Sequence, residues 1–179
     1  MLSKSQLAAR VVLGLILAKA TAQFWLVRRN ARGARAHAGE VPEAFRDMID
    51  AVTYARSIEY TLAKLRLRQI ADLADALMLV VVLFSGVLPA AWESVSRGWG
   101  STSWAMSAFL LVVNLGLGLL GLPWEWYAQF GVEARFGFNT TTRRLWCLDR
   151  LKGLALGVLL GYPLLVLVLQ LANWTGRGW

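Results

Sequence analysis

The feature that most constrains this chain is a series of long apolar segments separated by blocks of basic residues. A membrane-spanning helix needs about 20 mostly apolar residues. Four segments meet this requirement, and we expect spans at about 8–27, 70–92, 103–123 and 151–172. With 57% hydrophobic and only 17% charged residues, a soluble domain would leave much apolar surface in water. The sequence therefore predicts an all-α, polytopic integral membrane protein that forms one domain over residues 1–179.

The first apolar segment has a second interpretation. Arg10, the apolar run after it and the small residues of AKATAQ are also typical of a secretory signal with its cleavage site. However, apolar character resumes at FWLV and is followed directly by the basic block RRNARGARAH, as at a membrane exit. We therefore favour a retained helix.

The basic residues predict the orientation of the chain. The connection at 28–69 contains nine Lys and Arg residues, and the connection at 124–150 contains four. The opposite side carries only Lys4, Arg10, Arg97 and Arg177. Because Lys and Arg are enriched in cytoplasmic connections, we expect both polar connections in the cytoplasm and both termini outside, in a bacterial inner membrane. These charges flank apolar runs, so the net charge of +8 indicates membrane lipid as a partner and not nucleic acid.

The connection between the first and second spans predicts a long amphipathic cytoplasmic helix. Pro42 suits its first turn. From there to residue 69, apolar residues recur every three to four positions, as on one face of a helix. We expect this helix to continue directly into the second span.

Small residues in the fourth span indicate how it packs. Gly153, Gly157 and Gly161 lie four residues apart, which leaves one helix face without side chains and predicts close packing against a neighbouring helix.

Polar residues at membrane depth must face protein or water, because hydrocarbon offers them no partner. Lys19, Asn114 and Gln170 therefore either line a functional chamber or form interhelical hydrogen bonds. Asp72 and Asp75 could suggest an ion path through a transporter or channel. They lie where the amphipathic helix enters the membrane, however, so interfacial solvation explains them.

The composition also limits metal and redox chemistry. The chain contains one histidine, His37, and one cysteine, Cys147. These counts exclude an HExxH zinc helix, a self-contained His-rich metal site and an intrachain disulfide within this sequence. We expect no metal site and no cofactor in it.

A dense polar block, GVEARFGFNTTTRRLWCLDRLKG, separates the third and fourth spans. Gly137 favours a turn, and Asn139 or Thr140 suits the N-cap of a helix that runs into the fourth span. Asp149 and Lys152 share one face of that helix, where they can pair. Local physical chemistry thus predicts an ordered elbow and does not by itself show an active site.

The same block resembles the N-terminal half of type I CAAX prenyl proteases, which carry a run of the form E-x-x-x-G-F-N-x-x-T…D-x-x-K-G before a membrane helix. Two earlier stretches are similar to the family's H-x-x-x-V-P-x-x-F loop and its Y-T-x-x-K run. The candidate site residues, which stand in register with these motifs, are His37, Pro42, Tyr60, Lys64, Glu133, Gly137, Phe138, Asn139, Thr142, Asp149 and Lys152.

This resemblance implies a membrane zinc metallopeptidase built from seven helices around an intramembrane chamber. Eukaryotic members remove the last three residues of prenylated CAAX proteins. The family's zinc and its water-activating glutamate belong to an HExxH helix. Because the sequence reaches LANWTGRGW without that helix, we expect zinc only in a separate catalytic half and no activity from this chain alone.

Two functions are compatible with these observations. The chain is either the N-terminal membrane portion of a CAAX-type zinc metalloendopeptidase or a stand-alone, non-enzymatic scaffold or regulator that retains the fold. In the first case its partner is a catalytic half, and Glu133, Asn139, Asp149 and Lys152 either brace that half and guide substrate or simply order the elbow. In the second case its partner is another membrane protein. In both cases we expect His37 to be a hydrogen-bonding loop residue and not a metal ligand.

Overall fold

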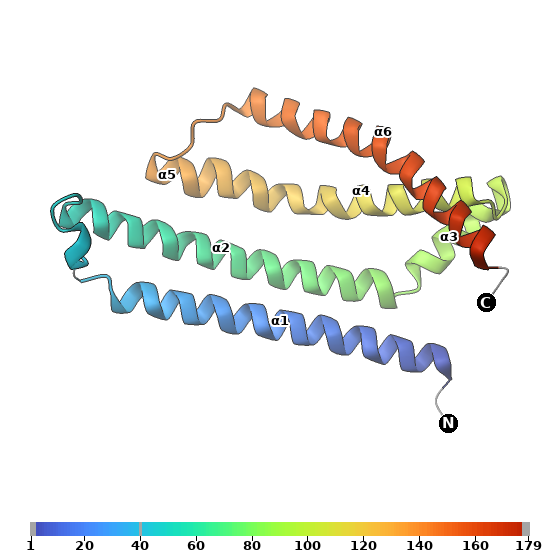
Figure 1. Cartoon of the computed structure of the whole chain (residues 1–179), viewed down its shortest axis with the longest axis horizontal. Coiled ribbons are helices and arrows are strands. Elements are labelled where there is room, and N and C mark those ends of the chain that lie inside the picture. Colours follow the sequence, from blue (N-terminus) through green and yellow to red (C-terminus); the bar gives the residue numbers. More distant parts are fainter. Residues whose placement is uncertain (1–2, 40, 177–179) are drawn as a thin grey trace. The chain divides into compact units, whose positions relative to one another are not determined.

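The computed structural model describes residues 3–39 and 41–176, and every regular element within these ranges is helical (Figure 1). The chain divides into two compact units, of which the first contains residues 1–82 and 123–139 and the second residues 83–122 and 140–179. The elements are α1 (Lys4–Ala36), η1 (Glu43–Phe45), α2 (Ala51–Phe84), α3 (Val87–Trp99), α4 (Ser103–Tyr127), η2 (Ala128–Glu133), α5 (Ala134–Phe136) and α6 (Arg143–Thr175).

Three helical stretches in the described part of the chain are long and apolar enough to cross a membrane. They are α1, α6 and the stretch Ser103–Phe136 that α4 forms with η2 and α5. Helices α2 and α3 pass the same test only as a pair, and they are bent by 53° at the break between them. The multi-span, all-α prediction is confirmed in this form, with three or four spans.

The break between α2 and α3 falls inside the second predicted span. Gly86 takes a φ of 80°, a left-handed conformation that costs glycine little, and it precedes the first residue of α3. Pro89 lies in the first turn of α3, where a missing backbone N–H leaves no hydrogen bond unmade. A broken span or a re-entrant segment therefore stands where we expected one continuous helix at 70–92.

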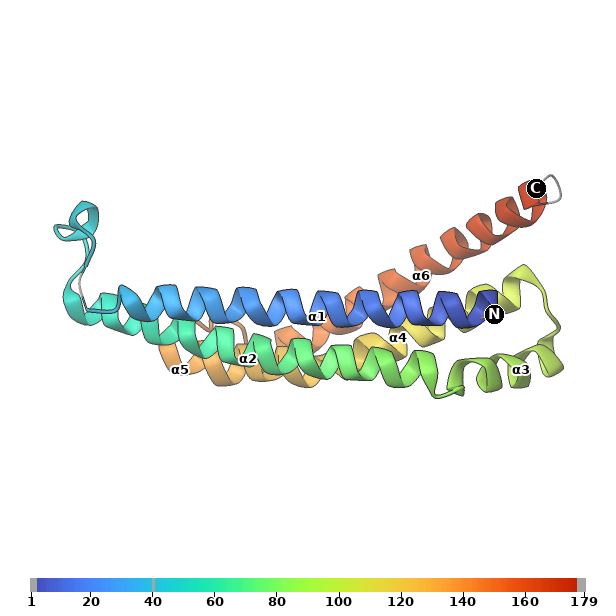
Figure 2. The same cartoon turned by 90° about the horizontal axis from the view of Figure 1, so that it is seen from below.

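In the first unit, α1 and α2 lie side by side and run in opposite directions (Figure 1, Figure 2). A capping box begins α1: Ser3 Oγ accepts from the Gln6 backbone N–H, and the Gln6 side chain accepts from the Ser3 N–H. The helix then continues past the first predicted span and through the basic block to Ala36. The arginines that follow the apolar run therefore belong to the same helix.

Helix α2 begins later than the sequence indicated. Pro42, expected in the first turn of this helix, instead precedes the short turn η1. The Asp50 carboxylate accepts from both the backbone N–H (2.8 Å) and the hydroxyl (2.7 Å) of Thr53, and these bonds hold the pKa of that carboxyl below its usual range. Asp50 is thus the effective cap of α2. Its carboxylate accepts a hydrogen bond from a free helical N–H, whereas the side chain of proline has no hydrogen-bond acceptor. From Ala51 the helix is continuous to Phe84, as predicted.

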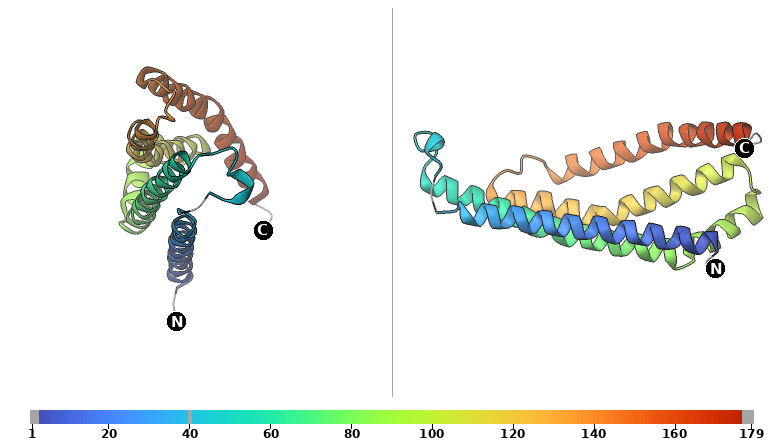
Figure 3. Two further views of the ribbon diagram at one scale, coloured as in Figure 1. Left: turned by 90° about the vertical axis from the view of Figure 1, so that its left-hand side faces the viewer. Right: turned by 60° about the horizontal axis from the view of Figure 1, so that its bottom comes forward.

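In the second unit, the C-terminal half of α6 approaches the start of α4 (Figure 1, Figure 3). The rings of Trp104 and Tyr162 lie 6.2 Å apart, and the Asn173 amide donates to Ser103 Oγ at 3.0 Å. A Cβ on Gly161 would lie 3.6 Å from Leu111, so this glycine lies against α4. Around Gly153 and Gly157, by contrast, nothing in the described part of the chain comes within 4 Å of such an atom. The predicted packing face is therefore used within this unit at only one of its three positions.

The elbow between α4 and α6 differs from the predicted one at both ends. The helix does not stop at Pro123, which lies inside α4, but continues as the π-helix η2 and then α5 to Phe136. The N-cap of α6 is Thr142, whose hydroxyl accepts from the Leu145 N–H at 3.2 Å. The prediction of Asn139 or Thr140 was wrong, and Asn139 is already engaged because its side-chain oxygen accepts from Gln129 at 2.7 Å.

Candidate functional site

The first unit brings six of the motif positions into one group of contacts. Tyr60 and Lys64 lie on α2, Glu133 ends η2, and Gly137, Phe138 and Asn139 follow α5. These residues, together with Phe136 and Gln129, are called the elbow cluster below. The motif runs Y-T-x-x-K and E-x-x-x-G-F-N, which are distant in sequence, therefore meet in space.

The charged part of the elbow cluster is centred on Lys64. Its ammonium group donates to the Tyr60 hydroxyl at 3.0 Å and lies 3.6 Å from Glu133 Oε1. The Lys64 and Glu133 side chains are 50% and 25% exposed, so solvent screens the ion pair. Such a pair contributes about 0.2–1 kcal/mol, and it serves more to fix the register between α2 and η2 than to supply stability.

The apolar part of the elbow cluster surrounds the Tyr60 ring. The ring of Phe136 meets it edge-on at 5.4 Å, and the ring of Phe138 lies 4.7 Å from it. Phe136 is 7% exposed, whereas Phe138 is 55% exposed. Aromatic pairs at these separations are worth about 0.5–1.5 kcal/mol beyond the area they bury. The three rings therefore hold the elbow against α2 more firmly than the ion pair does.

A helix-ending turn positions Phe138 for this contact. Gly137 takes a φ of 81° and donates its N–H to the Ala134 carbonyl, while the Phe138 N–H donates to the Glu133 carbonyl at 2.9 Å. This pair of bonds is a Schellman motif, which glycine favours because a side chain would be strained there. The turn predicted at Gly137 is confirmed.

Gln129 is a member of the elbow cluster that no sequence motif indicates. Gln129 donates its side-chain amide to Asn139 Oδ1 at 2.7 Å and so links η2 to the residue after the turn. The two residues are ten positions apart, a spacing that corresponds to no helical or strand period. The bond depends on the π-helical turn of η2, for which the sequence has no signal.

The remaining motif positions lie outside the elbow cluster. The His37 ring nitrogen Nδ1 lies 2.8 Å from the Gly33 carbonyl oxygen, at the end of α1. Pro42 precedes η1, and Thr142 caps α6. Asp149 and Lys152 are exposed on α6, and the described residues give neither of them an ion pair. Their predicted pairing is therefore absent.

No group of three or more His, Cys, Asp or Glu side chains capable of holding a metal ion occurs in the described part of the chain. The polar residues expected at membrane depth, Lys19, Asn114 and Gln170, are exposed within their own units. The two alternatives for these residues, lining a chamber or forming interhelical hydrogen bonds, stay predictions.

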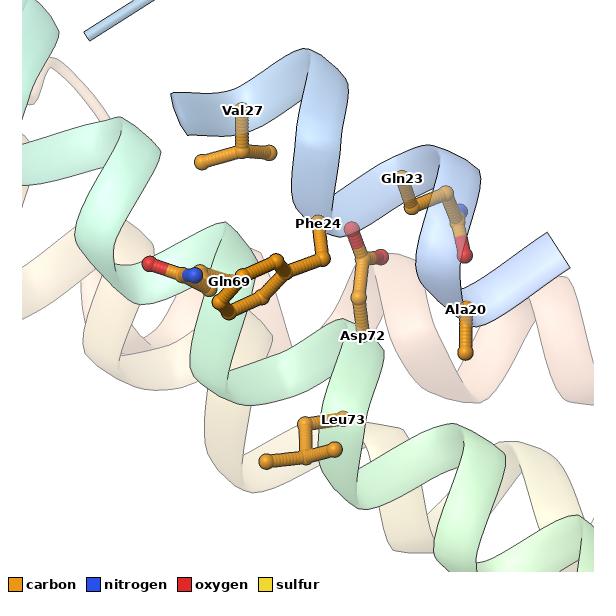
Figure 4. Close-up of a pocket in the computed structure, with 7 residues that line it drawn as sticks. All are labelled: Ala20, Gln23, Phe24, Val27, Gln69, Asp72 and Leu73. Atoms are coloured by element: carbon orange, nitrogen blue, oxygen red, sulfur yellow. The ribbon is translucent and has the colours of Figure 1, made fainter. Parts of the chain in front are cut away.

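A small cavity of about 30 Å³ lies between α1 and α2 (Figure 4). Asp72 points into this seam from α2, with Gln23 and Phe24 of α1 beside it. Its buried Oδ2 accepts no hydrogen bond from the described residues, and Arg68 Nε lies 3.7 Å away. Arg68 thus partly balances the negative charge of the Asp72 carboxylate, which faces α1.

Comparison with known proteins relates this arrangement to one family. The family model described as "CAAX prenyl protease N-terminal, five membrane helices" matches residues 30–179. The chain is 31% identical over 147 residues to CAAX prenyl protease 1 of Saccharomyces cerevisiae, covering 74% of this chain and 31% of that protein. It is 27% identical over 153 residues to the CAAX prenyl protease 1 homolog of Taenia solium, covering 77% of this chain and 32% of that protein.

A solved structure shares the fold. The crystal structure of S. mikatae Ste24p matches with a TM-score of 0.83 and 24% sequence identity, over 94% of this chain and 40% of that one. The chain spans about a third of the length of the curated relatives it matches. The family is described as having five membrane helices, whereas the described residues of this chain contain three or four spans.

Proposed function

This chain belongs to the CAAX prenyl protease family, in its N-terminal membrane domain, and we propose that it forms the N-terminal membrane portion of a zinc metalloendopeptidase. It is an integral membrane protein with several apolar helices. In the proposed role it contributes part of the wall of an intramembrane chamber and its substrate rim, and it does not catalyse by itself.

The match to the N-terminal family model over residues 30–179 carries this proposal. The elbow cluster supports it, because the motif residues that the resemblance singled out make contact with one another instead of lying scattered.

The chemistry would come from a catalytic half. Its HExxH helix would hold zinc, which polarises the peptide carbonyl and supplies a water nucleophile. With His37 as its one histidine, this chain has no such motif. Its own residues would position the elbow: the ion pair and the three rings fix the end of η2 and the segment after it, where Glu133 and Asn139 lie.

The proposed topology places both basic connections in the cytoplasm and both termini outside. The arginines that continue α1 beyond Val27, and those of the 124–150 connection, support this orientation through the bias of Lys and Arg toward the cytoplasmic side. On this orientation the elbow cluster and the start of α2 face the cytoplasm, where prenylated CAAX proteins are found.

The test is co-purification and activity. An HExxH-bearing membrane fragment encoded beside this chain should co-purify with the tagged chain from detergent. The complex should contain one zinc ion and should release the C-terminal tripeptide from a prenylated CAAX peptide. The chain purified alone should do neither.

Each other outcome changes the conclusion. Stoichiometric tight zinc, or peptide cleavage, in the chain purified alone would falsify the proposal that it is catalytically empty. If no such fragment is encoded nearby and the chain instead co-purifies with an unrelated membrane protein, a non-enzymatic scaffold becomes the better conclusion.

A further inference from the structure

A second cavity between α1 and α2 is rimmed by arginine. It has a volume of about 420 Å³, and Arg28, Arg32 and Arg35 of α1 face Arg66 of α2 across it. Apolar side chains, including Val27 and Leu65, also line it. We call this cavity the arginine groove. Val27 and Gln69, both labelled in Figure 4, line it and also the small cavity beside Asp72, so the two are neighbours along one seam.

The charge of the arginine groove is unbalanced. None of its lining residues is acidic, and its four arginines form no ion pair with the residues that the structure describes. The nearby Arg68 differs: it lies in a separate cavity with Asp72 and pairs with that carboxylate. Four guanidinium groups around one cavity repel one another, and an anion between them would relieve that repulsion. The groove therefore offers four positive charges without an acidic partner in its lining.

The position of the arginine groove along the helices indicates which anion. In α1 the apolar run ends at Val27 and Arg28 follows it directly. In α2 the apolar segment begins next to Gln69, which also lines the groove. Both helices thus change from basic to apolar at the level of the groove. In a bilayer this level is where the hydrocarbon gives way to phosphate groups.

We propose that the arginine groove binds the phosphate of an anionic phospholipid headgroup. Guanidinium groups match phosphate oxygens with paired, charge-assisted hydrogen bonds. The apolar side chains in its lining would contact the first carbons of the lipid chains, which a free phosphate ion lacks. The guanidinium carbon of Arg28 lies 4.4 Å from the centre of the Phe24 ring. This cation–π contact holds the Arg28 charge at the level where the apolar run of α1 ends. This inference does not depend on the proposed proteolytic role.

The test measures lipid affinity of the full chain in neutral detergent. The probe is fluorescent phosphatidylglycerol, compared with phosphatidylcholine carrying the same label. Wild type should bind phosphatidylglycerol at least tenfold more tightly than phosphatidylcholine. The double variant R32Q/R66Q, with one change on each helix, should lose roughly 25-fold of that affinity, at about fivefold per arginine.

A matched control separates the groove from general charge. The variant R29Q/R56Q removes the same charge from the same two helices but changes residues that do not line the groove. It should lose no more than about twofold, since solvent screens charges outside the site. If R32Q/R66Q cannot be purified, R28Q/R35Q tests the same groove.

Four results would overturn the proposal. The first is equal binding of the two lipids by wild type, and the second is an equal loss of affinity in the groove and control variants. The third is full displacement of phosphatidylglycerol by inorganic phosphate at millimolar concentration, which would make the occupant a free phosphate. Failure of lipid binding alongside capture of an acidic segment of a catalytic half would likewise replace lipid with protein as the occupant.

Discussion

The motif residues of the first unit and those of the second unit are in contrasting surroundings. In the elbow cluster, Tyr60, Lys64 and Glu133 find their partners within the chain. On α6, the exposed Asp149 and Lys152 form no ion pair with the described residues, and Gly153 leaves open space where a side chain would stand. The first set is therefore explained by the fold of its own unit. The second set is not explained by the fold of its own unit. Its partners would have to lie elsewhere, such as in the catalytic half that we propose.

The largest expected effect comes from filling the open face of α6. Gly153→Leu with Gly157→Leu should not lower the thermal stability of the isolated chain, because nothing in the described part of the chain lies within 4 Å of a Cβ at either position and leucine favours a helix more than glycine does. Overpacking an interface costs roughly 1–3 kcal/mol for each added side chain, so the yield of complex with a catalytic half should drop at least tenfold. Co-purification measures this yield.

The control for that experiment is Gly14→Leu, which places the same side chain at an equally open glycine of α1. It should leave the complex intact. Normal complex formation by the α6 double variant would remove the contrast between the two units, because the open face would then have no partner to lose.

A smaller effect is expected where glycine is required by the backbone. Gly137→Ala places a side chain at a φ of 81° and should destabilise the chain by about 1–2 kcal/mol. Gly153→Ala lies in a regular helix and should be neutral or stabilising by up to about 1 kcal/mol. Thermal unfolding in detergent, followed by circular dichroism, compares the two. Equal stability of both variants would show that the turn does not hold the elbow.

Gly137 also shows how much of the site the sequence could predict. Its turn was predictable because one residue type and its flanking aromatics determine the local conformation. The apolar segments likewise predicted a multi-span helical protein, and the resemblance to the family's motifs singled out Tyr60, Lys64 and Glu133. These features depend on short stretches of sequence, which can be interpreted without knowing the tertiary structure.

Other features depend on contacts that no local pattern encodes. The Lys64–Glu133 ion pair joins two distant helices, and the Gln129–Asn139 bond requires the π-helical turn of η2. The N-cap of α6 is Thr142, whereas the side chain of Asn139 accepts from Gln129. The break at Gly86 lies in an apolar run. The average hydropathy of that run is little changed by one glycine, so it gives no sign of the break. The ion pair and the Gln129–Asn139 bond thus arise from tertiary structure, whereas the break at Gly86 is a local backbone effect of one residue.

The aromatic part of the elbow cluster should contribute a moderate amount. Phe138→Ala removes the ring that lies 4.7 Å from Tyr60 and should destabilise the chain by about 0.5–1.5 kcal/mol. Phe45→Ala is the matched control, since Phe45 is 49% exposed against 55% for Phe138 and has no ring contact among the described residues. Its change should stay within about 0.5 kcal/mol. Similar losses for both variants would mean that exposure, and not the Tyr60 contact, determines the cost.

The smallest effect tests the contrast most directly, through coupling energies. A double-mutant cycle of Lys64→Met and Glu133→Gln should give a coupling of about 0.2–1 kcal/mol that weakens as salt is added, because the pair is partly exposed. The same cycle with Asp149→Asn and Lys152→Met should give no coupling in the isolated chain, where these two side chains form no ion pair. Repeating the second cycle in the presence of a catalytic half tests whether Asp149 and Lys152 interact only in the complex. A coupling that appears only in the complex would show that the two side chains act jointly in one contact with that half, whereas a coupling already present in the isolated chain would show that the two units use their motif residues alike.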